Sequence, residues 1–179
     1  MSQEIVDFWF SDEVSKLWFR STPEFDQLLT DRFEETWQQA SRGELDQWMD
    51  SAVGCLALAI LLDQFPLNMY RNSALSFSTE AKSREIARFA IERDFDKSLP
   101  VEQRSFLYMP FMHSESLEDQ DLALQLFDQP GLEGNFRFSH HHRAIVEKFG
   151  RFTHRNEVLG RDSSAAEIEY LDSKEAFTG

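Results

Sequence analysis

The residues best suited to chemistry lie between Arg137 and Arg161, a stretch that holds six Lys or Arg and four of the five histidines. Only two acids, Glu147 and Glu157, occur there, so its formal charge is +4. The other 154 residues hold 12 basic and 30 acidic side chains. A basic island in an acidic chain is a candidate site for a small anion, because its local potential is positive.

His142 is the histidine that a helical pattern directs inward. Phe138, His142, Ile145 and Phe149 are spaced i, i+4, i+7 and i+11, which predicts one shared helix face. Consecutive residues diverge by about 100° on a helix, so the three adjacent histidines do not form one cluster. His142 is therefore either a core histidine bonded to a backbone carbonyl or part of a pocket lining.

An irregular segment follows Gly150 and carries Arg151, His154, Arg155 and Arg161. Irregular backbone beside a helix end often carries binding residues. These four groups repel one another unless acids or a ligand lie among them. We favour a ligand site here over a solvated loop paired with the acidic surface.

A second candidate stretch runs from Tyr108 to Glu115. Pro110 inside a helical pattern predicts a kink, because proline has no N–H to bond the carbonyl of Phe106. His113 then lies at a helix end, where its protonated form is favoured. Glu115 is placed to pair with His113 or with an arginine. His113 and Glu115 are thus candidates for acid–base chemistry, and a purely structural cap of the helix end is the alternative.

A third candidate stretch, Asp63–Arg71, follows the most apolar part of the chain. A carboxylate there is expected to pair with a cation, supplied by Arg71 or by the basic segment. Cys55 lies within the apolar run and is expected to be a buried, inert thiol. Glycine-rich phosphate loops and metal-binding histidine pairs are absent from the sequence, so we predict no metal and no cofactor.

Helical signals dominate the elements that must position these residues. No run alternates with a period of two, and the helices are expected to have short connections. This predicts an all-α fold of seven to eight antiparallel-packed helices, with tetratricopeptide-like helix pairs, in one domain spanning residues 1–179. The first helix is expected to start at Ser2 and the last at Ser164. The helices between them are expected over residues 23–43, 44–62, 79–94, 101–113, 116–127 and 138–149. The expected N-caps are Ser2, Thr22, Ser116 and Ser164. Residues 63–71 are expected to form an ordered loop before and after Pro66.

Composition excludes several classes of protein. A net charge of −14 argues against binding to nucleic acid and to an acidic membrane surface. The apolar run Ala52–Leu62 is shorter than the roughly 18–20 residues that a membrane span needs. A single cysteine favours a reducing compartment, so we expect a soluble cytoplasmic protein. Its oligomeric state is not indicated by the sequence.

Three stretches together resemble a known bacterial family, domain of unknown function 924. They are LDQFPLNMYR (62–71), FLYMPFMHSE (106–115) and FGRFTHRNEVLGR (149–161), and the resemblance extends from about Ile5 to Arg161. It implies a tetratricopeptide-like helical fold and assigns no activity. The chain departs from the family pattern at Leu67 and Thr153. The family motifs carry onto Asp63, Gln64, Phe65, Pro66 and Arg71, onto Tyr108, Pro110, His113, Ser114 and Glu115, and onto His142, Gly150, Arg151, Phe152, His154, Arg155, Asn156 and Arg161.

The leading functional hypothesis is a helical binding module in which these three stretches converge on one Arg/His-lined pocket. Its ligand would be a small anion or a peptide carboxylate. One alternative is an enzyme on a small anionic substrate, with His113 or His154 as general acid/base and Glu115 or Asp63 orienting it. The other alternative is a helical scaffold without a ligand, in which the polar motifs only hold helix ends together.

Overall fold

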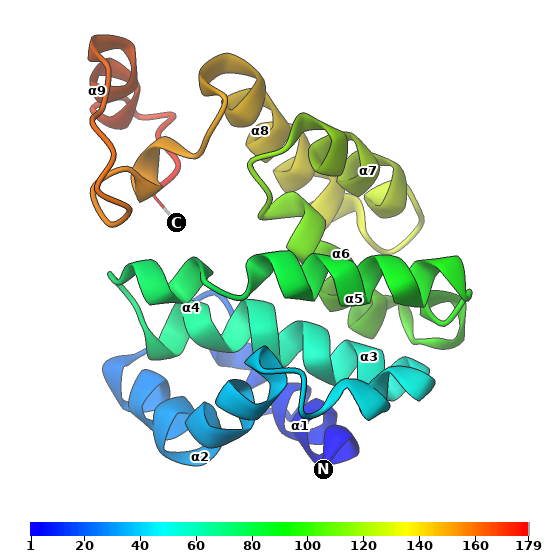
Figure 1. The fold of residues 1–179 in the computed structure, drawn as a ribbon. Coiled ribbons are helices and arrows are strands. Elements are labelled where there is room, and N and C mark those ends of the chain that lie inside the picture. Colours follow the sequence, from blue (N-terminus) through cyan, green and yellow to red (C-terminus); the bar gives the residue numbers. More distant parts are fainter. Residues whose placement is uncertain (179) are drawn as a thin grey trace. The chain divides into compact units, whose positions relative to one another are not determined.

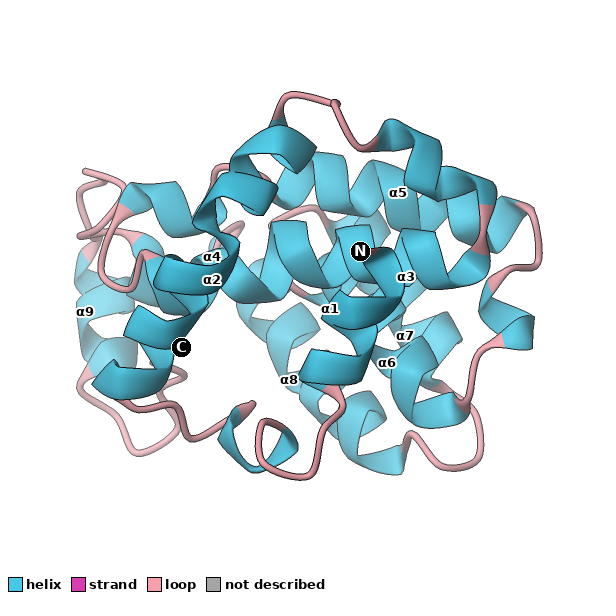
Figure 2. Ribbon diagram, turned by 90° about the horizontal axis from the view of Figure 1, so that it is seen from below, coloured by secondary structure: helices cyan, strands magenta, loops and turns pink. Residues whose placement is uncertain are grey.

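The computed structural model describes residues 1–178, and every regular element within them is helical (Figures 1 and 2). A π-helical turn, Ile60–Gln64, joins α3 and α4 into one continuous helix. When this continuous helix is counted once, the described residues contain eight α-helices, and the expected all-α fold is confirmed for them. The expected tetratricopeptide-like arrangement stays a prediction. The helices are α1 (Ser2–Trp9), α2 (Pro23–Ser41), α3 (Ala52–Ala59), α4 (Phe65–Met69), α5 (Glu80–Glu92), α6 (Val101–Met112), α7 (Leu117–Phe127), α8 (Glu133–Phe149) and α9 (Ala165–Leu171).

The chain forms two compact units. Unit 1 comprises Met1–Arg71 and Leu75–Pro110, and unit 2 comprises Asn72–Ala74 and the chain from Phe111 onward. The expected single domain over residues 1–179 stays a prediction, and each unit is described by itself.

Unit 1 is built around α3, which packs against α1 and α5. Residues Cys55–Leu62 are completely buried. The continuous helix Ala52–Met69 is long and apolar enough to cross a membrane, but 78% of it is buried, as in the core helix of a folded unit. Burial raises the pKa of the Cys55 thiol to about 11, so the thiol is protonated at neutral pH, as expected for an inert core cysteine.

The helix through Pro66 corrects two expectations. Residues 63–71 were expected to form a loop after a helix that ends before Pro66, yet the helix continues to Met69. A proline at position 66 cannot bond the carbonyl of Leu62, and the π-helical turn absorbs this mismatch by shifting the bonding to i→i+5. The Leu62 carbonyl accepts a 2.6 Å hydrogen bond from the Thr79 hydroxyl. Thr79 thus ties the α5 end of the unit to the π-helical turn.

Two of the four expected N-caps are confirmed by their side-chain bonds. Thr22 accepts from the Phe25 N–H ahead of α2, and Ser164 and Glu167 form a complete capping box at α9. Ser2 is wrong as a cap, because it already lies inside α1. Ser116 occupies the N-cap position of α7 without a side-chain bond. The third helix starts at Ala52 and not at Glu44, because Ser51 caps it and a 3-10 turn precedes it.

Unit 2 is organised by α8, which packs against α7. α8 begins at Glu133, one turn before the expected start, and Phe138 is 60% exposed, so its expected inward position is wrong. The buried stripe instead runs through Ser139, His142, Ile145 and Val146. Four residues of an α-helix turn through about 400°, which is about 40° more than a full turn, so Phe138 is rotated away from His142 towards solvent. His142 therefore lies inside the unit, as its place in the pattern predicted.

We predict that Thr79→Val destabilises unit 1 by about 2–4 kcal/mol. Valine has the same shape, but it removes the donor to the Leu62 carbonyl and the acceptor of the buried Trp37 Nε1–H (3.2 Å). Thr30→Val is the matched control, because the Thr30 hydroxyl bonds only a carbonyl within its own helix. Urea unfolding followed by circular dichroism measures both variants, and equal losses of stability would contradict this role of Thr79.

Candidate functional site

The basic segment begins where α8 ends. Gly150 has φ of +71°, a left-handed conformation that glycine adopts without strain, and it turns the chain out of the helix. Arg151 follows directly and reaches Glu167 on α9. Its Nε and Nη2 donate to the two carboxylate oxygens at 2.7 and 3.0 Å, and Nη2 also donates to the Asp162 carbonyl at 2.8 Å. This bidentate pair ties the start of the basic segment to α9.

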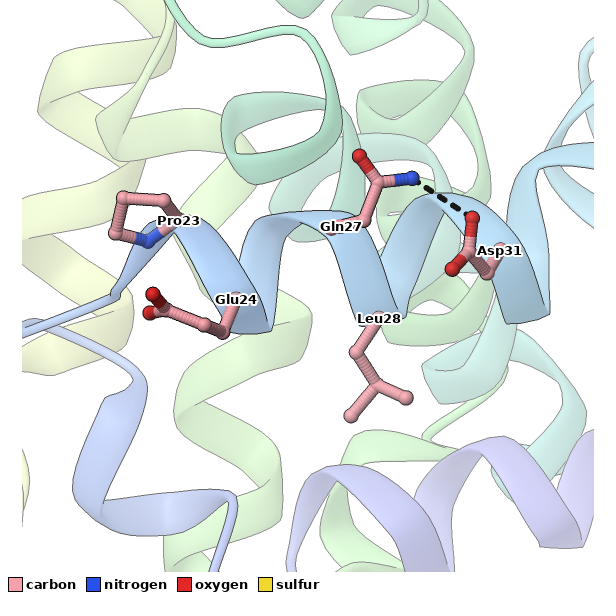
Figure 3. A pocket seen from close by; sticks show the side chains of 5 residues that line it. All are labelled: Pro23, Glu24, Gln27, Leu28 and Asp31. Carbon is pink, nitrogen blue, oxygen red and sulfur yellow. Dashed lines mark hydrogen bonds between the residues drawn. The ribbon is translucent and has the colours of Figure 1, made fainter.

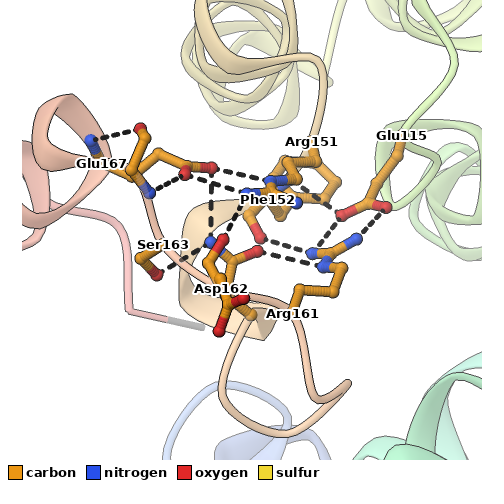
Figure 4. A network of polar contacts seen from close by, with 9 residues as sticks. Glu115, Arg151, Phe152, Arg161, Asp162, Ser163 and Glu167 are labelled. Carbon is orange, nitrogen blue, oxygen red and sulfur yellow. Dashed lines mark hydrogen bonds and ion pairs between the residues drawn. The ribbon is translucent and has the colours of Figure 1, made fainter.

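A second bidentate pair joins Arg161 to Glu115 (Figure 4). Arg161 Nη1 and Nη2 donate to the carboxylate at 2.7 and 2.9 Å. The same carboxylate accepts from the Phe152 N–H at 2.8 Å, and Arg161 donates to the Phe152 carbonyl at 3.0 Å. Both backbone polar groups of Phe152 are therefore held by this pair.

Asn156 connects the two pairs. Its amide nitrogen donates to Glu167 (3.3 Å) and to the Ser163 hydroxyl (3.0 Å), while its amide oxygen accepts from Arg161 Nε at 3.0 Å. Asn156 is 1% exposed, so these bonds lie inside unit 2. We call the connected set Arg151, Glu167, Asn156, Arg161 and Glu115 the ion-pair chain.

The pKa values of the two acids follow from this arrangement. Hydrogen bonds from Arg151 hold the pKa of Glu167 far below its usual value, against the opposing effect of burial. Burial alone would raise the pKa of Glu115, but the bonds from Arg161 and the Phe152 N–H outweigh it and lower the pKa. Both carboxylates therefore remain ionised at neutral pH, and they balance the two arginines.

Arg155 is placed differently from the other two arginines. It is 6% exposed, its Nη2 donates to the His113 carbonyl at 3.0 Å, and its guanidinium lies 4.8 Å from the centre of the Phe152 ring. The His113–Glu115 and Arg151–Arg161 stretches, 36 or more residues apart, are thus brought together in unit 2.

The buried His142 and the partly buried His154 of unit 2 are neutral at pH 7. Desolvation lowers the pKa of His142 to about 3 and that of His154 to about 4. His142 Nδ1 lies 2.8 Å from the Phe138 carbonyl, which can only accept, so Nδ1 carries the hydrogen. This is the bonded core histidine that was one of the two expectations for His142.

The end of α6 is closed by side chains of unit 2. Ser114, 2% exposed, donates to Asp119 at 2.7 Å and accepts from the Ser116 N–H. Gln120 donates to the carbonyls of Met112 and Ser114, each at 2.7 Å. These bonds satisfy carbonyls that a helix end leaves without an intrahelical partner, which supports the structural alternative for this stretch.

The remaining predicted site residues lie in unit 1. Asp63 and Gln64 are buried in the π-helical turn, where Gln64 Nε2 donates to Asp63 at 2.6 Å. Arg71 pairs with Asp26 at 2.8 Å, and the buried Tyr108 hydroxyl donates to Asp96 at 2.6 Å. Convergence of all three stretches on one site therefore stays a prediction, because it involves both units.

An open depression of about 500 Å³ lies on α2 of unit 1 (Figure 3). It is lined by Pro23, Glu24, Gln27, Leu28 and Asp31, and Gln27 donates to Asp31 at 2.7 Å. Its rim carries acids and no predicted site residue, so it does not match the expected anion pocket.

The expected pairing of Glu115 with an arginine is confirmed by Arg161, but the other acid partners were not predicted. Glu167 was recognised only as part of a capping box, and Ser163 and Asp162 were not singled out. The available signal was the repulsion among Arg151, Arg155 and Arg161, which required acids or a ligand nearby. Within residues 1–178, no group of three His, Cys, Asp or Glu side chains is placed to hold a metal ion.

Comparison with known proteins gives two similarities and one negative result. Among curated proteins, none matches this chain. A solved structure of ATU0120, a protein of unknown function from Agrobacterium tumefaciens, is 38% identical, with a TM-score of 0.91 and 96% of each chain covered. The family model of a bacterial protein of unknown function, DUF924, matches residues 5–175. The expected resemblance is confirmed, and the chain belongs to the DUF924 family of bacterial proteins.

Proposed function

We propose that this protein is a helical scaffold whose basic segment acts internally, by holding the irregular chain after α8 against α9 and the end of α6. The observation that carries this proposal is the bidentate pairing of Arg151 with Glu167 and of Arg161 with Glu115. Paired arginines satisfy carboxylates that the chain itself supplies, so no external anion is needed to balance them.

The charge count supports the same proposal. Three acids from outside residues 137–161, namely Glu115, Asp121 and Glu167, pair with Arg161, Arg143 and Arg151. Adding these three charges to the formal +4 of the segment leaves +1. An anion would have to displace a carboxylate that is already oriented and covalently tethered, hence present at a high effective concentration. The anion-binding pocket is therefore the less supported hypothesis, with Arg155 as the arginine it would most depend on.

A second candidate function, acid–base chemistry on a small anionic substrate, is favoured by one observation. His154 is partly exposed and neutral at pH 7, so its imidazole can accept a proton, although a pKa of about 4 makes it a weak base. Glu115 supports this candidate less well, because Arg161 and the Phe152 N–H engage both of its oxygens. His113 and His154 are the residues whose replacement would abolish such an activity.

The ion-pair chain predicts a large effect of Glu167→Ala. This change leaves Arg151 without its carboxylate and removes the capping box, so we expect a loss of about 2–4 kcal/mol in the free energy of unfolding. Glu169→Ala is the matched control on the same helix, where the side chain is exposed and about 0.5 kcal/mol or less is expected. Urea unfolding of both variants measures this, and similar losses would remove the support for the scaffold.

Thermal melting in different anions separates the scaffold from the anion pocket. We expect phosphate and citrate to raise the melting temperature over chloride at matched ionic strength by the same amount in wild type, Arg151→Ala and Arg155→Ala. Both anions stabilise proteins through exclusion from the surface, which these arginines do not affect. An increment that disappears in either variant would instead identify an anion site and refute the scaffold proposal.

The lowered histidine pKa values predict acid sensitivity. In the folded protein the pKa values of both histidines lie below the usual 6.5. Above pH 6.5 both side chains are neutral in the folded and in the unfolded chain, so neither lowers the stability. As the pH falls from 6.5 towards 4, only the unfolded chain takes up protons, and the folded protein loses stability. Each histidine then lowers the free energy of unfolding by up to about 1.4 kcal/mol per pH unit. His142→Asn, which keeps a donor for the Phe138 carbonyl, should lose less stability between about pH 6.5 and pH 4.5 than wild type.

The exposed His140 supplies the control for this pH series. His140→Asn should follow the wild-type curve, because the His140 side chain is exposed and folding does not remove it from water. If His142→Asn and wild type had the same pH dependence of the unfolding free energy, the burial of a neutral His142 would be refuted.

A further inference from the structure

Phe177 fills a small socket of aromatic and imidazole rings in unit 2. Its ring centre lies 4.5 Å from that of His142 and 4.9 Å from that of His154, with interplanar angles of 59° and 88°. The rings of His141 and Phe152 lie within 6.5 Å of it. Tilted and edge-to-face arrangements at these distances are the preferred geometries of aromatic pairs. We call these four rings, without Phe177, the aromatic socket.

The floor of the aromatic socket is part of the core of unit 2. His142 and Phe152 are 5% and 1% exposed, and Ile145 and Val146 pack in the same cluster. The backbone of Phe152 is held by Glu115 and Arg161, and the ring of His142 is oriented by its bond to the Phe138 carbonyl. These hydrogen bonds do not involve Phe177, although its ring packs against the same cluster, so the polar contacts that hold the floor come from other parts of the unit.

The segment that carries Phe177 is held far less firmly. α9 ends at Leu171, and residues 172–175 and Thr178 are exposed. The polar contacts of this segment are local: the Tyr170 hydroxyl donates to the Glu175 carbonyl and accepts from the Phe177 N–H, and the Ser173 hydroxyl accepts from the Glu175 N–H. Within residues 172–178, only Ala176 and Phe177 are partly buried. Phe177 is thus the aromatic side chain through which this segment contacts the core of unit 2.

We propose that the aromatic socket is a recognition site for an aromatic side chain of a partner peptide, and that Phe177 occupies it in competition with that partner. The bound Phe177 shows the chemistry that the socket accepts: an apolar ring in tilted and edge-to-face contact with two imidazoles, with its backbone N–H bonded to the Tyr170 hydroxyl. This proposal goes beyond the scaffold function: the Glu115–Arg161 pair holds the backbone of Phe152, whereas Phe177 contacts the socket through ring packing alone.

The tethering of Phe177 sets the expected size of the competition. A side chain on a short flexible segment reaches its site at an effective concentration in the millimolar range. If a free peptide binds the vacant socket with a dissociation constant of about 100 μM, competition from the bound Phe177 therefore lowers its apparent affinity at least about tenfold. Weak binding to wild type and stronger binding after removal of the Phe177 ring is the expected signature.

The test uses full-length protein and a fluorescein-labelled peptide with the sequence of residues 172–179, DSKEAFTG. Fluorescence anisotropy is measured against wild type and Phe177→Ala, after circular dichroism has established that both are folded. We expect the peptide to bind Phe177→Ala at least about tenfold more tightly than wild type. A peptide with alanine in place of its phenylalanine should bind neither protein.

Two further variants in the Phe177→Ala background locate the binding. His154→Ala removes one wall of the socket and should weaken the peptide at least about tenfold, whereas Phe138→Ala, an exposed ring on α8, should leave it unchanged. Equal affinity for wild type and Phe177→Ala, absence of saturable binding to Phe177→Ala, or equal binding of the alanine peptide would each overturn the proposal. A wild-type dimer that Phe177→Ala converts to monomer would assign the socket to a second copy of the chain and overturn it as well.

Discussion

Unit 2 depends on the bidentate pair between Arg161 and Glu115, because this pair fixes both backbone polar groups of Phe152. Phe152 in turn is the core residue on which Arg155 lies and against which Ile145 and Val146 pack. Local turn bonds satisfy part of the backbone after Gly150, among them the bond from the Arg155 N–H to the Phe152 carbonyl at 3.1 Å, and side chains complete the rest. Here a charged pair performs that task, since charge-assisted bonds are the strongest available.

Such a design has a cost that determines how the rest of the unit is arranged. Taking an ion pair out of water is favourable only when further hydrogen bonds complete it. Asn156, Ser164 and the Phe152 N–H supply those bonds, which explains why short polar side chains and backbone groups surround the two carboxylates. Removing one side chain of the ion-pair chain therefore leaves several polar groups without hydrogen-bond partners, so the contacts of this segment depend on one another.

The sequence predicted local features of this arrangement and missed the long-range ones. The capping box of Ser164 and Glu167 and the inward position of His142 depend on neighbours within a few residues, so their patterns were readable. An arginine partner for Glu115 was one of two expectations, but the sequence did not show that it is Arg161, which lies 46 residues away. Pro66 misled for a related reason. Its local preference ends a helix, but the distant Thr79 hydroxyl and a π-helical turn let the helix continue.

Pairing with acids also changes the charge that the basic island, residues 137–161, presents in the folded protein. Formal charge along a sequence suggests a field that attracts anions, but the field depends on the acids that folding places beside each cation. Asp121, Glu115 and Glu167 come from three other parts of unit 2 and neutralise three of the arginines. Beside Phe152 there remain the guanidinium of Arg155 and two neutral imidazoles, with the ring of Phe177 packed among them. Folding thus converts a basic stretch of sequence into a neutral aromatic cluster with one cation beside it.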